Sequence, residues 1–205
     1  MTIDLAALEV LAKERSSADP AHDLAHVRRV AQSARAIAIA ERADPEVCVS
    51  AALLHELFSY PKNHPDSAHS GEICAEHARR ELFVRGTDAE LTDQICYAIA
   101  VHPFSRGIVP ATLAAKILQD ADRLDALGAI GIARCFATAG LLGHPFYANE
   151  DPFCAQRQPE LYAVDHFYAK LLKLPNRLHT AAARAIAVER LALMHAFLAQ
   201  LAREI

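Results

Sequence analysis

Residues 51–57 read Ala51-Ala52-Leu53-Leu54-His55-Glu56-Leu57, so two side chains that can bind a metal follow four apolar residues. A buried carboxylate is costly unless a cation or a proton neutralises it, and a neutral imidazole is a good ligand for transition metals. We therefore interpret His55-Glu56, placed within a helix, as half of a metal site. His26 upstream and Asp122 downstream are the candidates for the other two ligands.

The composition is that of a globular protein that can bury a substantial core. The chain has 205 residues, of which 53% are hydrophobic and 22% are charged. The net charge of -4 and the isoelectric point near 6.2 give no overall basic surface. This argues against a long nucleic acid as partner and leaves a small phosphorylated molecule open as substrate.

The cysteines and the apolar segments indicate a cytoplasmic protein. The five cysteines are scattered and form no Cys-x-x-Cys pair, which predicts reduced thiols. The N-terminus carries acids among its apolar residues and does not resemble a signal peptide. The longest apolar run, residues 126–143, contains Arg134 and several glycines, so we expect no membrane span.

Apolar residues recur at helical spacing along almost the whole chain, which predicts an all-α fold. Three helix starts are marked by an aspartate, at Asp23, Asp44 and Asp88, and Pro45 strengthens the second. We expect a single globular domain over residues 1–205, with a core at about 20–142 and a helical extension at about 143–205. Helices are predicted over residues 5–11, 23–38, 44–55, 70–83, 88–102, 110–119, 124–142, 161–173 and 180–204. A long polar loop, residues 143–159, lies between two of them.

Each proposed ligand has a plain structural alternative. His26 precedes Val27 and Val30 and so faces inward, where a lone histidine is usually a hydrogen-bonded core residue. Asp122 is one of three aspartates within six positions, and either a bound cation or Arg123 would relieve their repulsion. As a set, two histidines and two carboxylates favour a divalent transition metal, namely Mn, Fe, Co, Ni or Zn.

The order His26, His55-Glu56 and Asp122 resembles the H…HD…D signature of the HD-domain metal-dependent phosphohydrolases. Further blocks resemble the bacterial YedJ/YpgQ-type subgroup, from about residue 20 to the C-terminus. These blocks are His22-Asp23-x-x-His26-x-x-Arg29-Val30, Lys62-Asn63-His64-Pro65, Ala98-Ile-Ala-x-His102-x-Phe104-Ser105, Gln119-Asp120 to Ala133, Asp151-Pro152-Phe153 and His166-Phe167-x-x-Lys170-Leu-Leu-x-Leu.

The resemblance implies an all-helical HD bundle around one ion and hydrolysis of a phosphoester or phosphoanhydride, with nucleotides as substrates. In such a site the ion activates a water for attack on phosphorus. The chain departs from the family at one position, because members of the family carry aspartate where this sequence has Glu56. Its additional methylene group requires a shifted ion, an adjusted side chain or a bridging water.

Several other residues are candidates for catalysis or substrate binding. Lys62, His64 and His102 lie at helix ends, where they could neutralise phosphate charge or protonate a leaving oxygen; a solvated loop position is the alternative for the first two. Asp125 could orient a water or a ligand imidazole, and its alternative is a salt bridge with a neighbouring arginine.

The proposed substrate-binding residues are His64, Arg123, Tyr162, His166 and Lys170, and Asp165 lies next to His166. Ordinary pairing of Asp165 or His166 with Lys170 explains that last group equally well.

The sequence and the resemblance thus predict a metal-dependent phosphohydrolase that acts on a small phosphorylated substrate, a nucleotide, as a monomer or homodimer. The alternative is a non-catalytic HD module that binds a nucleotide or a partner protein and whose metal site is weakened by Glu56. Other catalytic patterns are absent from the sequence: there is no phosphate-binding Gly-x-x-x-x-Gly-Lys-Ser/Thr loop, no Gly-x-Gly-x-x-Gly, no Gly-x-Ser-x-Gly and no His-Glu-x-x-His.

Overall fold

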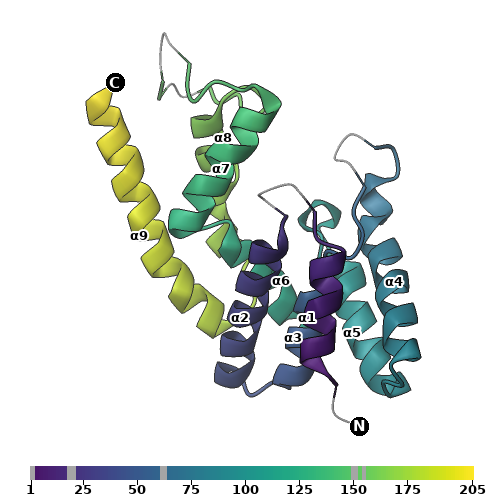
Figure 1. Ribbon diagram of the computed structural model, residues 1–205. Coiled ribbons are helices and arrows are strands. Elements are labelled where there is room, and N and C mark those ends of the chain that lie inside the picture. The colour runs from purple at the N-terminus through teal and green to yellow at the C-terminus, as the bar shows by residue number, and fades with distance from the viewer. Residues whose placement is uncertain (1–2, 18–21, 61–63, 149–151, 154–155) are drawn as a thin grey trace. The chain divides into compact units, whose positions relative to one another are not determined.

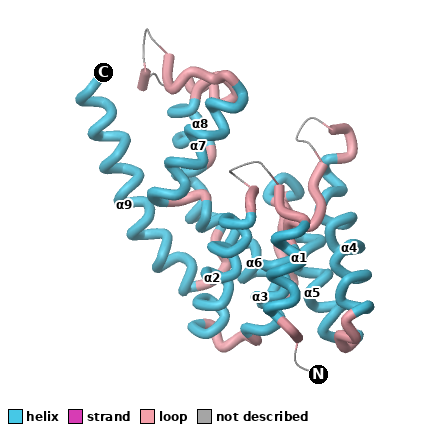
Figure 2. The backbone as a smooth tube through the Cα atoms, viewed as in Figure 1, coloured by secondary structure: helices cyan, strands magenta, loops and turns pink. Residues whose placement is uncertain are grey.

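The computed structural model describes residues 3–17, 22–60, 64–148, 152–153 and 156–205 (Figure 1). Within these ranges the chain is helical and has no strand, which confirms the predicted all-α class (Figure 2). The α-helices are α1 Leu5–Glu14, α2 Leu24–Ala40, α3 Pro45–Leu54, α4 Ser70–Val84, α5 Ala89–Val101, α6 Leu113–Asp125, α7 Gly128–Leu142, α8 Ala163–Ala169 and α9 Ala181–Glu204. Three short 3-10 helices are η1 Ser67–His69, η2 Phe104–Arg106 and η3 Leu171–Arg177.

The helix starts follow from local capping chemistry. Asp23, Asp44 and Asp88 each accept a hydrogen bond from a backbone N–H in the first turn of the helix they precede. Pro45 occupies the first position of α3, where its missing N–H has no intrahelical partner to lose. The three starts predicted from these residues are therefore confirmed.

The chain forms two compact units, Met1–Asp122 and Arg123–Ile205, and the boundary falls within α6. The prediction of one domain with a core up to residue 142 and a C-terminal extension stays a prediction.

In the first unit α3 is the central helix. It packs against α1, α2 and α5, and α4 lies against α5 (Figure 1). Every residue of α3 from Val47 to Leu54 is buried, so the helix has no polar face. Because α3 is covered on all sides, the residues at its C-terminal end emerge inside the unit.

In the second unit α7 packs against α8 and α9 through aromatic side chains. The ring of Phe136 lies 5.9 Å from that of Phe167 and 5.8 Å from that of Phe197, centroid to centroid. The predicted break between residues 119 and 124 is wrong, because α6 continues to Asp125 and α7 begins at Gly128. Gly128 has a φ of 71°, which a residue with a side chain rarely adopts, so the break falls there.

Helix α9 is apolar and only partly covered. By length and composition alone it is the one single helix of the described residues that could cross a membrane. One such helix is weak evidence, because core helices of soluble proteins pass the same test. Met194 and Leu198 are among the few buried residues of α9.

Candidate metal centre

His55 and Glu56 do not lie inside a helix, contrary to the prediction. Helix α3 ends at Leu54, His55 is its C-cap, and Glu56 belongs to the turn that follows. Within a helix, adjacent side chains diverge by about 100°. Because the helix stops at Leu54, the two side chains turn toward the same space.

The other two predicted ligands come from the ends of two further helices. His26 lies in the first turn of α2, where Asp23 accepts a hydrogen bond from its backbone N–H at 2.8 Å, and its side chain is fully buried. Asp122 lies in the last turn of α6, and 27% of its side chain is exposed. Three helix ends in the first unit therefore supply the candidate site.

The structure brings the four predicted ligands together. Nε2 of His26 lies 3.3 Å from Nε2 of His55 and 3.6 Å from Oδ1 of Asp122. Oε1 of Glu56 lies 3.9 Å from Nε2 of His26 and 3.8 Å from Nε2 of His55. One atom of His26 thus faces the three other side chains.

The hydrogen bond on the far side of the His55 ring determines which nitrogen carries the proton. Nδ1 of His55 lies 2.6 Å from the carbonyl oxygen of Ala52, which can only accept, so Nδ1 donates. Burial lowers the pKa of His55 to about 4, which keeps the ring neutral near pH 7. Nε2 therefore presents a lone pair toward Nε2 of His26, as a metal ligand does.

Glu56 is held in its charged form. Burial alone would raise its pKa, but a hydrogen bond from His22 and the nearby imidazoles outweigh this effect and lower the pKa to about 2. Among the residues that the structure describes, two groups of side chains place ligand atoms within 4.8 Å of one another: His22, His26 and Glu56, and His26, His55 and Asp122. Their nitrogen and oxygen atoms suit a divalent transition metal.

His102, predicted as catalytic, lies beside this cluster at the C-cap of α5. Its ring meets that of His55 edge-on, with centroids 5.3 Å apart and an interplanar angle of 87°. Its Nδ1 lies 2.6 Å from the carbonyl oxygen of Ile99 and must donate to it. Nε2 of His102 is consequently the atom that can exchange a proton.

The two loop candidates have different outcomes. Lys62 lies outside the described residues. His64 stacks on Tyr60, with ring centroids 4.3 Å apart, and its Nδ1 accepts a hydrogen bond from the backbone N–H of Asp66 at 3.1 Å. Its role in substrate binding stays a prediction.

Two predicted residues that follow Asp122 on α6 have partners of their own in the second unit. Asp125 is buried and accepts a hydrogen bond from Arg134 at 2.7 Å, which is the salt bridge considered as its alternative role. Arg123 donates to the carbonyl oxygen of Arg177 and lies 3.0 Å from Nε2 of His179.

The remaining substrate candidates, Tyr162, His166 and Lys170, lie just before α8, on it and at its end, and all are half-buried. Their role in substrate binding stays a prediction. The neighbouring Asp165 pairs with Arg157 at 3.1 Å. The pairing of Asp165 or His166 with Lys170 stays a prediction.

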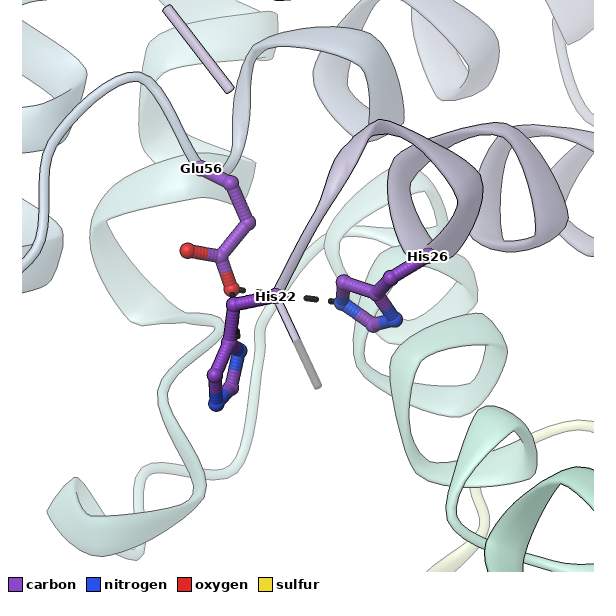
Figure 3. Close-up of side chains that lie close together, drawn as sticks. All are labelled: His22, His26 and Glu56. Atoms are coloured by element: carbon purple, nitrogen blue, oxygen red, sulfur yellow. Dashed lines mark hydrogen bonds and ion pairs between the residues drawn. The ribbon is translucent and has the colours of Figure 1, made fainter. Parts of the chain in front are cut away.

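Sequence reasoning missed one residue of the cluster. Nδ1 of His22 lies 3.2 Å from Oε1 of Glu56, and the rings of His22 and His26 meet edge-on (Figure 3). A signal was present in His22-Asp23-x-x-His26, where two histidines stand four positions apart. Because His22 precedes the first residue of α2, helical periodicity gave no reason to assign it to the site.

Comparison with known proteins identifies the family. The HD domain family matches residues 23–127, a segment that contains all four predicted ligands. The protein YpgQ of Bacillus subtilis (strain 168) is 36% identical over 188 residues, which cover 90% of this chain and 84% of that protein.

Solved structures have the same fold over almost the full length. The crystal structure of Bacillus subtilis YpgQ in complex with ADP matches with a TM-score of 0.77 and 31% identity, covering 98% of both chains. An HD-superfamily hydrolase from Bacillus thuringiensis matches with a TM-score of 0.73 and 29% identity, covering 98% of this chain and 93% of that one. The chain belongs to the HD domain family.

Proposed function

We propose that this protein is a metal-dependent phosphohydrolase that cleaves a phosphoester or phosphoanhydride bond of a nucleotide in the cytoplasm. The observation that carries the proposal is the pair of Nε2 atoms of His26 and His55, 3.3 Å apart, with two carboxylates beside them. Two lone pairs at this distance repel unless a cation or a proton lies between them. The YpgQ structure in complex with ADP supports a nucleotide as the ligand.

The residues of the cluster have separate tasks in this proposal. A divalent cation bound there would lower the pKa of a water and withdraw charge from a phosphoryl oxygen. His26, His55, Glu56 and Asp122 would hold it, and the charged carboxylate of Glu56 balances part of its charge. His102, whose ring centroid lies 5.3 Å from that of His55, would give a proton from Nε2 to the leaving oxygen.

The test combines metal analysis with a turnover assay. Protein purified without chelator should contain a divalent metal and should release phosphate or pyrophosphate from at least one member of a nucleotide panel with added Mn²⁺ or Co²⁺. His55→Ala should lower turnover by more than about 100-fold, because losing a ligand costs more than losing an outer-shell partner. Far-UV circular dichroism should show an unchanged helix content.

His195→Ala is the matched control, because it removes an exposed imidazole of α9. It should leave turnover unchanged. Metal-free, inert protein that still binds a nucleotide would refute the proposal and favour the non-catalytic binding module. Equal turnover of His55→Ala and the wild-type protein would remove His55 from the mechanism.

A further inference from the structure

His22 lies immediately before α2 and faces the carboxylate of Glu56. Its side chain is 35% exposed, and its Nδ1 lies 3.2 Å from Oε1 of Glu56. Figure 3 shows the Glu56 carboxylate directed toward both His22 and His26, with a dashed line to each. The ring centroids of the two histidines are 5.8 Å apart. His22 therefore lies at the solvent side of the predicted metal centre.

The oxygen that His22 contacts is the same oxygen that faces the buried histidines. Oε1 of Glu56 lies 3.9 Å from Nε2 of His26 and 3.8 Å from Nε2 of His55. A glutamate side chain has one more rotatable bond than the aspartate of the family signature, so it needs an additional restraint to present one oxygen in one place. A hydrogen bond from His22 provides that restraint.

We propose that His22 is a positioning residue of the metal centre, which donates a hydrogen bond from Nδ1 to Oε1 of Glu56 and holds that oxygen toward His26 and His55. This inference rests on the cation site of the proposed function and assigns a fifth residue to it. Outer-shell partners of this kind orient a ligand and raise metal affinity without touching the ion.

The first test measures Mn²⁺ affinity by isothermal titration calorimetry on the full chain after chelator treatment, without any turnover assay. His22→Ala should weaken Mn²⁺ binding by about 10- to 100-fold. His22→Gln should retain affinity to within about threefold of wild type, because its amide N–H can donate to the carboxylate but is a poor metal ligand. Equally weak binding by both variants would overturn the hydrogen-bonding role.

The second test asks whether His22 acts through Glu56. In Glu56→Asp the shorter side chain withdraws the carboxylate from His22, so adding His22→Ala should have little further effect. The two substitutions should therefore be strongly non-additive in a double-mutant cycle. Full additivity of the two effects would show that His22 acts independently of Glu56 and would overturn the proposal.

His69→Ala is the matched control, because His69 makes the same kind of contact elsewhere in the first unit. Its Nδ1 lies 2.8 Å from Oε2 of Glu72 at an exposed site. Mn²⁺ affinity should not change in this variant. Wild-type protein that binds Mn²⁺ but cleaves no nucleotide would refute the proposed function and leave the role of His22 standing. If the wild-type protein cleaves a nucleotide but His22→Ala binds Mn²⁺ as tightly as the wild-type protein does, the role of His22 is refuted and the proposed function stands.

Discussion

The carboxylates considered as candidate site residues have different partners in the two compact units. In the first unit Glu56 and Asp122 lie against the imidazoles of His26 and His55. An imidazole can be neutral near pH 7, and the lowered pKa of His55 makes it so. The carboxylates beside the neutral ring of His55 carry negative charge, which a divalent cation would balance.

In the second unit the partners are arginines. Arg134 lies 2.7 Å from Asp125, and Arg157 lies 3.1 Å from Asp165. A guanidinium group is charged at all accessible pH values, so each of these pairs is balanced without a ligand. Asp165 also accepts a hydrogen bond from the backbone N–H of Gln158, so this pair attaches the end of the long loop to α8.

The comparison teaches that the type of partner, more than burial, separates a candidate site from a structural pair. Asp125 and Asp165 are more buried than Asp122, and yet they are the ones with permanent positive charges beside them. A carboxylate against imidazoles is a candidate for ligand binding. A carboxylate against a guanidinium group is a candidate for stability.

The largest expected effect on stability is in the second unit. Arg134→Ala leaves the buried carboxylate of Asp125 without its guanidinium partner and should lower the free energy of unfolding by about 3 kcal/mol. Urea denaturation followed by circular dichroism measures this loss. Arg79→Ala is the control, because it removes an arginine of the same kind from an exposed pair with Asp93 and should cost less than about 1 kcal/mol. Equal losses in the two variants would break the contrast between buried and exposed pairs.

The second prediction concerns stabilisation by a cation. Mn²⁺ at about 100 times its Kd should raise the free energy of unfolding of the wild-type protein by about 3 kcal/mol. Asp122→Asn should abolish most of this gain, because it removes a charged ligand. Without metal, the same substitution should change the free energy of unfolding by less than about 1 kcal/mol. Thermal unfolding with and without Mn²⁺ measures both quantities.

Arg134→Ala is the control for the cation experiment as well. It should start from a lower stability but gain as much from Mn²⁺ as the wild-type protein, because its partner Asp125 is not a predicted ligand. Loss of the Mn²⁺ response in Arg134→Ala would show that the arginine pair and the metal centre are not independent.

The parts of the fold that were predictable have local causes. Asp23, Asp44 and Asp88 cap helices that begin at the next residue, and Pro45 reinforces one of them. The break between α6 and α7 was placed too early, because the sequence on both sides is apolar. The left-handed conformation of Gly128 marks the true break, but several glycines follow it closely in the sequence.

The candidate ligands could be named from the sequence because each stands among apolar residues or in a dense run of acids. Their contacts could not. His22, which lies outside any helix, contacts Glu56, which is 34 positions further along the chain. Asp125 pairs with an arginine nine positions away, on the next helix, where helical spacing gives no guidance. Such partners depend on how helices pack, which periodicity does not encode.

The smallest of these effects is the pH dependence of the metal-free protein. Burial lowers the pKa of His55 from 6.5 to about 4, so the unfolded chain binds a proton between these values that the folded protein does not. The contribution of His55 to stability is therefore greatest above pH 6.5 and falls as the pH drops toward 4. Between pH 7 and 4.5 the loss from His55 should be about 2 kcal/mol. Urea denaturation at several pH values, with chelator present, measures this slope.

His55→Gln should flatten that slope, whatever its own effect on stability at pH 7. Glu56 does not interfere in this range, because its lowered pKa makes its charged form favourable in the folded state and its contribution is lost only as the pH falls from 4.5 toward 2. The arginine pairs of the second unit keep their positive charge throughout. An unchanged slope in His55→Gln would mean that the buried imidazole is not what distinguishes the first unit from the second.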